Sequence, residues 1–161
     1  MDKILKRDDK LAFMALEDDN SSFTRLRGFT EFSMSKNPVE YSRRYIDEKN
    51  ERSDVVGFSP TISYSFDRFS DDAVHNALVE ITDSEAVGSE AVRRILIVDV
   101  SCEDEQKPAF LRNWSVIPDS EGDDSDAYTY SGTLKSNGAM TTGTATSTDD
   151  WLTCTFTPDN E

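Results

Sequence analysis

The amino-acid sequence predicts a mainly β protein, a β-sandwich or partly closed barrel with one flanking α-helix. Short segments in which apolar and polar residues alternate recur along the chain, separated by turn-forming residues. Only one segment, near 71–82, has apolar residues at helical spacing. Nine Phe, five Tyr and two Trp supply the bulk for a core, and 161 residues fit a single domain spanning 1–161.

The first strands are expected at 10–16 and 29–35. The segment 10–16 is a short apolar run, and turn residues follow it at 17–22. Alternation within 29–35 places Phe32 and Met34 on a buried face. Pro38 then ends this strand.

The clearest strand is predicted at 61–67. Its apolar face carries Ile62, Tyr64 and Phe66. The opposite face is polar and consists of Thr61, Ser63, Ser65 and Asp67. One face of this strand is therefore expected to contact the core and the other solvent.

The single helix is predicted over 71–82. Its apolar stripe consists of Val74, Ala77, Leu78 and Ile81. Ser70 stands where an N-cap is expected, and Asp71 and Asp72 favour the positive end of the helix dipole.

The second half of the chain reads as further strands. The run at 93–100 is typical of a strand covered on both faces, and 109–118 alternates. The remaining residues predict three short strands with a turn at 136–138. In the first of these strands, Tyr128, Tyr130 and Leu134 share one side. In the last, Leu152, Cys154 and Phe156 alternate with Trp151, Thr153 and Thr155.

Residues 36–54 form a charged segment with β-forming side chains, among them Val39, Tyr41, Tyr45 and Ile46. Too few apolar residues alternate along this segment to cover a core of its own. A strand-prone segment of this kind favours aggregation unless its partner is specific. Its mixed-sign charge indicates that the partner is another copy of the chain, which favours assembly over catalysis.

The charge balance restricts the function classes. Acidic residues number 32 against 17 basic ones, so the formal net charge is 17 − 32 = −15. This balance argues against a sequence-reading nucleic-acid binder, which needs a basic face for phosphates. It is compatible with a surface that DNA passes without binding. The N-terminus has no signal-peptide pattern, and no apolar run approaches the roughly 20 residues that span a bilayer, so membrane insertion is not expected.

The residues provide little for catalysis, metals or cofactors. His75 is the only histidine and is expected to be structural or exposed. Cys102 and Cys154 lie far apart and are expected to be reduced thiols, not zinc ligands. The acidic loop 119–126 fails the EF-hand pattern and reads as solvated, with a cation site as the alternative. No catalytic residues, no metal and no cofactor are predicted.

Three stretches of the sequence, with the closing G-T-A-T and C-T-F-T-P, resemble the major tail tube proteins of long-tailed (siphovirus-type) bacteriophages. They are 36–67, the predicted helix with R-R-I-L-I-V-D-V, and 116–138. The resemblance implies a structural virion protein that is made in the bacterial host cytoplasm. Six copies would form a ring in which inner-face strands join a ring-wide β-barrel, and stacked rings would form the hollow tail tube that conducts DNA into the host.

The resemblance also implies partners and contacts. The implied partners are further copies of the chain, a tape measure protein, a tail terminator and distal tail proteins, with transient passage of DNA. It makes about 36–57 an extended inter-subunit arm, while 1–10 is expected to order only on assembly. The expected interface residues are Tyr41, Arg43, Arg44, Tyr45, Asp47, Glu48, Lys49 and Arg52, with Arg43 or Arg44 in inter-subunit ion pairs. The polar residues Ser63, Ser65 and Asp67 are candidates for the lumen-facing surface.

Two alternatives remain open at the level of the sequence. One is the inner tube protein of a contractile tail, a phage-tail-like bacteriocin or a secretion system. The other is a monomeric carbohydrate- or cation-binding β-sandwich that uses Trp114, Trp151 and the acidic loop. An enzyme is disfavoured because no nucleophile, base and orienting group can be assembled from these residues.

Overall fold

The computed structural model describes residues 2–17, 22–122 and 124–159. Most of the turn expected at 17–22, and Asp123 of the acidic loop, lie outside the described residues. The elements in chain order are η1 (Arg7–Asp9), β1 (Lys10–Met14), β2 (Ser22–Arg25), β3 (Phe29–Ser35), β4 (Pro38–Arg43), β5 (Arg52–Phe58), β6 (Thr61–Asp67), α1 (Ala73–Ser84), η2 (Gly88–Ala91), β7 (Val92–Asp99), β8 (Lys107–Glu121), β9 (Thr129–Ser136), β10 (Thr141–Thr146) and β11 (Thr153–Pro158).

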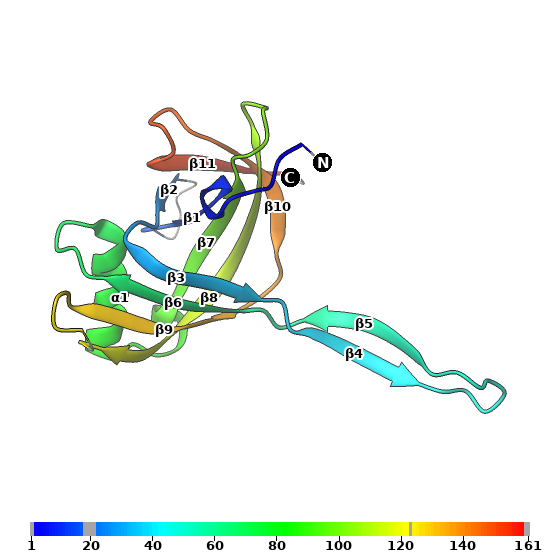
Figure 1. Ribbon diagram of the computed structural model, residues 1–161. Coiled ribbons are helices and arrows are strands. Elements are labelled where there is room, and N and C mark those ends of the chain that lie inside the picture. The colour runs from blue at the N-terminus through cyan, green and yellow to red at the C-terminus, as the bar shows by residue number, and fades with distance from the viewer. Residues whose placement is uncertain (1, 18–21, 123, 160–161) are drawn as a thin grey trace.

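Nine strands form one antiparallel sheet that curls partly into a ring (Figure 1). Their order is β10-β11-β2-β1-β7-β8-β9-β6-β3, and β10 also pairs with β8. The long strand β8 makes this possible, because its first half pairs with β10 and its second half with β9. The fold is thus a partial ring of strands continued by the sheet β8-β9-β6-β3, which confirms the predicted mainly β class with one helix.

The sheet separates two apolar clusters, and β7 contributes to both. Leu96 and Val98 lie in the cluster inside the ring, with Phe13, Phe23 and Phe156. Ile95 faces the other way, into the cluster between the sheet and α1 that contains Trp114. Both faces of β7 are therefore covered at Ile95 and Leu96, as predicted, whereas Ile97 on the outer face is only half-buried.

The helix α1 covers the apolar face of the sheet β8-β9-β6-β3 (Figure 1). Val74, Leu78 and Ile81 are buried there, as the spacing predicted. The start of the helix was predicted wrongly. Asp72, not Ser70, is the N-cap, because its backbone is extended and its carboxylate accepts hydrogen bonds from the N–H groups of Val74 and His75.

The end of β8 also differs from the expectation. The strand continues to Glu121, so the first residues of the acidic loop are strand residues that pair with β9. A register shift between Pro118 and Ser120 accommodates this extension. The acidic segment is therefore held at a sheet edge as far as Glu121.

The segment expected as an arm is a two-stranded hairpin, β4 and β5, that projects from the body (Figure 1). Its base continues the hairpin of β3 and β6 through a joint at Asn37 and Ser59. Asn37 has a left-handed backbone (φ 46°), accepts from the Ser59 N–H and donates through Nδ2 to the Ser59 carbonyl and the Thr61 hydroxyl. These bonds set the direction in which the arm leaves the body.

Over the described residues, no helix is long and apolar enough to cross a membrane.

Candidate subunit interface and lumen face

The arm exposes apolar side chains without a core to cover them. Val55, Val56 and Phe58 are more than half exposed, at 56, 63 and 58%, and Ile46 at the tip is fully exposed. A two-stranded hairpin alone is marginally stable in water, because it buries little apolar surface. The arm therefore has the character of a surface that is completed by contact with another molecule.

One cluster of charged and aromatic residues organises the distal half of the arm. Arg43 forms an ion pair with Asp54 (2.6 Å) and donates to the Tyr45 hydroxyl (2.9 Å). Its guanidinium also lies over the Tyr41 ring, 5.1 Å from the centroid. The hydrogen bonds to Tyr45 and to Asp54 raise the pKa of Arg43. The register of the hairpin brings these side chains together. Tyr41 lies directly opposite Asp54, and Arg43 lies opposite Arg52, two residues before Asp54 on the partner strand.

Arg52 extends this cluster to the turn of the arm. It makes two hydrogen bonds to the Glu48 carboxylate, of 2.6 and 2.9 Å, and lies over the Tyr45 ring. Of the eight predicted interface residues, the structure thus gathers five in one cluster: Tyr41, Arg43, Tyr45, Glu48 and Arg52. These five hold the arm in shape within one protomer.

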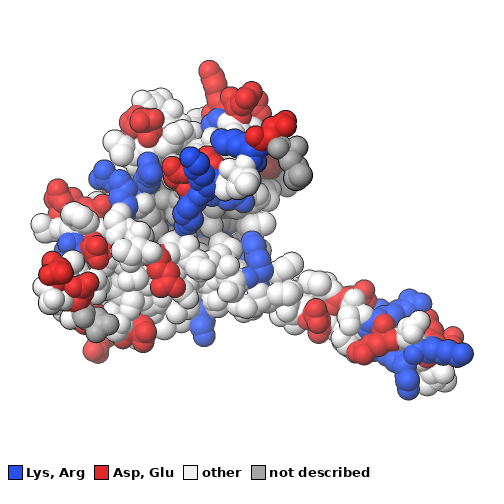
Figure 2. Space-filling view, in the orientation of Figure 1, with Lys and Arg blue, Asp and Glu red and all other residues white. Residues whose placement is uncertain are grey.

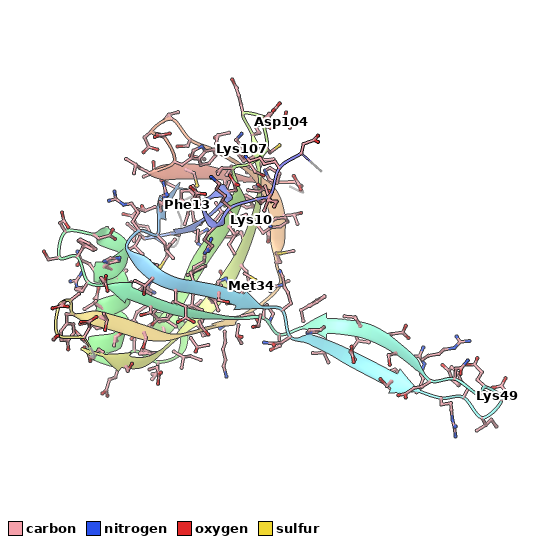
Figure 3. The ribbon with its side chains drawn as sticks, in the orientation of Figure 1. Lys10, Phe13, Met34, Lys49, Asp104 and Lys107 are labelled. Carbon is pink, nitrogen blue, oxygen red and sulfur yellow. The ribbon has the colours of Figure 1, made fainter. Side chains whose placement is uncertain are left out.

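The other three predicted residues, Arg44, Asp47 and Lys49, are exposed at the tip of the arm. Figure 2 shows mixed charge gathered at this distal end, and Figure 3 shows Lys49 at its extremity. Ile46 lies among them and was absent from the predicted set. The sequence feature that could have identified Ile46 as an interface residue is its β-branched apolar side chain within a charged segment.

The predicted lumen residues Ser63, Ser65 and Asp67 lie on the face of β6 opposite the core, since Ile62, Tyr64 and Phe66 alternate with them and are buried. Strand register places polar neighbours beside them on the same face. These are Glu31 and Ser33 of β3 and Thr129, Ser131, Thr133 and Lys135 of β9. The result is a surface of short hydroxyl side chains with few charges.

The sheet that carries this polar face has two open edges. β3 pairs only with β6, so its outer edge has no strand against it in the described part of the chain. On the other side, β7 pairs with β8 only as far as Ser115, so no strand of the described residues pairs with Val116–Glu121 on that side. Open edges of this kind are templates for strand addition.

His75 is structural and takes no part in these surfaces. It is fully buried, with Phe66 4.5 Å away between ring centroids. The Phe69 N–H donates to its Nδ1 (3.1 Å), so the proton lies on Nε2, which donates to the Arg27 carbonyl (2.6 Å). Both ring nitrogens of the neutral imidazole are therefore used in packing two loops against α1.

Other candidate sites from the sequence do not assemble. Trp114 is 2% exposed and lies in the core, so it cannot stack on a sugar at the surface. Among residues 2–17, 22–122 and 124–159, no three His, Cys, Asp or Glu side chains gather into a group that could hold a metal ion. Cys102 and Cys154 are both free thiols, and Cys154 is buried.

No protein-family model matches the sequence, and no curated protein matches it by sequence. The fold does match solved structures. A chain of the native gene transfer agent virion aligns with a TM-score of 0.61 and 14% identity, over 86% of this chain and 98% of that one. A chain from the tail of an empty gene transfer agent particle with C6 symmetry aligns with a TM-score of 0.53 and 14% identity, over 85% and 97%.

A third similar structure comes from a different kind of particle. A chain of the tube-terminating cap of the anti-feeding prophage aligns with a TM-score of 0.53 and 15% identity, over 90% of this chain and 94% of that one. At this identity the comparisons establish the architecture. This chain thus shares its fold, along nearly its whole length, with chains of gene transfer agent particles and of a prophage tube cap.

Proposed function

We propose that this chain is the protomer of a phage-type tail tube, in which six copies form a ring and rings stack into a hollow conduit for DNA. The observation that carries the proposal is the unfinished surface of the protomer. It has a sheet with two open edges and an arm that exposes apolar residues on a hairpin without a core. The similar chain from a tail with C6 symmetry supports six-fold rings.

In the proposed tube, the open edges join neighbouring copies within a ring, and the arm reaches a neighbouring copy or ring. Joining edges removes exposed strand edges and makes one continuous barrel of the sheets. The hydroxyl-rich face with Ser63, Ser65 and Asp67 then lines the lumen. Lys135 is its only cation among the residues that register places on that face, so DNA phosphates find few partners there.

A second candidate function is a tube or tube-cap subunit of a contractile, bacteriocin-like particle. The match to the anti-feeding prophage cap favours it, at a TM-score equal to that of the gene transfer agent tail. The same protomer surface serves either assembly. A sheath gene next to the gene for this chain would favour the contractile alternative.

The proposal is tested by concentrating the purified chain, alone and with the tail initiator and terminator proteins of its particle. Light scattering and negative-stain electron microscopy then report the assembly. We expect rings or tubes, and a persistent monomer under all these conditions would contradict the proposal.

The arm contact is tested by Arg44→Glu. Arg44 is a better choice than the pair Arg43 and Arg44, because Arg43 also holds the arm together through Asp54. Arg44→Glu is expected to prevent tube formation while leaving the far-UV circular dichroism unchanged, and Arg44→Lys should assemble. Normal tubes from Arg44→Glu would show that this side chain makes no assembly contact.

A further inference from the structure

A groove runs along the open edge of β3, between that strand and the outer face of β1, β7 and β8. One part of it has a volume of about 430 Å³ and apolar lining residues that include Phe32, Ile97 and Phe110. Lys10 of β1 and Met34 of β3 lie on opposite sides of it (Figure 3). A second part, of about 610 Å³, continues along β3 and shares Arg7, Lys10 and Phe32 with the first.

The lining of this groove is cationic in a strongly anionic protein. The two parts together are lined by seven of the 17 Lys and Arg residues and by one acidic residue, Asp8. The seven are Lys6, Arg7, Lys10, Arg25, Arg27, Lys36 and Arg112. Basic residues gather at the upper centre of Figure 2, next to β1 and the N-terminal segment. The formal net charge of the whole chain is −15, so this groove is where an acidic segment finds complementary charge.

The guanidinium of Arg112 lies at the wall of the groove and is not fully satisfied within the protomer. Its Nε is buried and makes no hydrogen bond among the described residues. At the β3 edge, the Arg7 side chain donates to the Phe32 carbonyl (3.1 Å). Guanidinium groups in such positions bind carboxylates in paired, charge-assisted hydrogen bonds.

A matching acidic segment lies at the other open edge of the same sheet. The unpaired part of β8 carries Asp119 and Glu121, and Asp124 and Asp126 follow it. All four residues are exposed. In the order β8-β9-β6-β3 every pair is antiparallel, so β8 and β3 run in opposite directions. A β8 edge from a rotated copy therefore approaches β3 in antiparallel orientation.

We propose that the groove along β3 receives the acidic end of β8 and the residues that follow it, 118–122 and 124–126, from a second copy of this chain. The inference rests on the proposed ring and identifies the ring contact as an acid-to-base junction. Main-chain pairing with β3 supplies the register, and the carboxylates meet Arg7, Lys36 and Arg112. The contact is head-to-tail. It closes into a ring where the rotations between successive copies add up to a full turn, as in the proposed six-fold ring, and both edges of every copy are then paired.

A direct test uses a synthetic, fluorescein-labelled peptide of residues 116–128 and the full-length protomer at low concentration. Fluorescence anisotropy in 50 mM NaCl should show binding, which should weaken as salt rises because the contact is ionic. We expect Lys36→Ala and Arg112→Gln each to weaken binding about tenfold. Lys135→Ala, which removes a cation from the opposite face of the sheet, is the matched control and should not change it.

A control peptide has Asn or Gln in place of its acidic residues and is expected not to bind. Equal binding of this peptide, or equal affinity in Arg112→Gln, Lys36→Ala and the unaltered protein, would overturn the proposal. Urea unfolding of each variant shows that the fold is retained. Lys36 is exposed, so its variant keeps the test valid if Arg112→Gln folds poorly.

Charge exchange separates this inference from the proposed function. Arg112→Glu and Glu121→Arg should each prevent ring formation, and the protein that carries both should recover it in part. If Arg112→Glu alone forms normal rings, the groove is not the ring contact and the tube proposal stands. If the unaltered chain never forms rings but binds the acidic peptide, the tube proposal fails and the groove assignment stands.

Discussion

The imidazole of His75 joins two loops at the N-terminal end of α1. It accepts from the Phe69 N–H and donates to the Arg27 carbonyl, and the rings of Phe29 and Phe66 enclose it. Gly28 follows Arg27 with φ of 75°, and a Cβ there would lie 3.1 Å from the imidazole Cε1. The tight turn and the histidine therefore depend on each other.

Replacing His75 with Phe tests this polar role. The ring volume is kept, but the Phe69 N–H and the Arg27 carbonyl lose their partner. A buried polar group left without a hydrogen bond costs about 1–3 kcal/mol, so we expect a loss of that order in the free energy of unfolding. Urea denaturation measures it. An unchanged midpoint would show that water satisfies both groups and that the imidazole serves only to fill space.

Burial of two titratable groups predicts a loss of stability in alkali. Burial raises the pKa of Tyr64 from 10.0 to about 12 and that of Cys154 from 9.0 to about 12. The folded protein therefore keeps both protons at a pH where the unfolded chain releases them. Stability is fully present below pH 9 and falls as pH rises from about 9 to 12, with a slope of at most about 1.4 kcal/mol per pH unit for each group.

Urea unfolding at pH 8, 9, 10 and 11 measures this dependence. Cys154→Ala is the control, because it removes the contribution that begins near pH 9 and leaves that of Tyr64, which begins near pH 10. A free energy of unfolding that stays constant from pH 8 to 11 would contradict the burial of both groups.

In strand β6, the alternation of buried and exposed side chains decides which substitutions destabilise the protomer. Ile62 is fully buried and its neighbour Ser63 is exposed on the polar face. Ile62→Asp places a charge in the core and is expected to cost more than about 4 kcal/mol, enough to unfold a typical domain of this size. Ser63→Asp introduces the same side chain one residue away and should leave thermal unfolding nearly unchanged. Similar melting curves for the two variants would refute the face assignment.

The strands were predictable from the sequence because each has a periodic face. Ile62, Tyr64 and Phe66 alternate with polar residues, and Ile95 to Val98 are apolar throughout because Leu96 and Val98 lie in one apolar cluster and Ile95 in the other. The start of α1 was less predictable. Ser70 and Asp72 are both good N-caps, and only the backbone conformation decides that Asp72 caps the Val74 and His75 N–H groups.

Features that depend on which strands pair in space could not be predicted from a single sequence. The second pairing of β8, with β10, places Gly143 beside Ala109 and partly closes the ring, and no local pattern encodes it. Likewise, the arm was predicted from its charge, but the ion pair between Arg43 and Asp54 follows from hairpin register. The predicted inter-subunit role therefore passes to Arg44 and its neighbours at the tip, where it remains a prediction.

At the scale of the whole molecule, one protomer carries complementary surfaces that it cannot bring together itself. The cationic groove follows the β3 edge and the acidic end of β8 lies at the opposite edge, with β6 and β9 between them. The arm extends away from the body (Figure 1). A protomer with two different, complementary surfaces favours head-to-tail contacts over a two-fold dimer. Rings and tubes are built from head-to-tail contacts.

Because the arm projects from the body and contributes no residue to either apolar cluster, we predict that it can be removed without loss of the fold. Pro38 and Phe58 are register partners at the base of the hairpin, so residues 39–57 can be replaced by a two-residue Asn-Gly turn. The apolar clusters draw on no residue of the deleted segment, and the free energy of unfolding should therefore stay within about 1 kcal/mol of the original.

Assembly should respond differently from stability in this variant. The β3 edge, the groove and the acidic end of β8 remain, so the shortened chain is expected to form rings but not long tubes, as judged by electron microscopy with the unaltered chain as control. Tubes of ordinary length would show that stacking does not use the arm. Loss of rings as well would place the arm in the contact between neighbours of one ring, and a large loss of stability would mean that the arm supports the body of its own protomer.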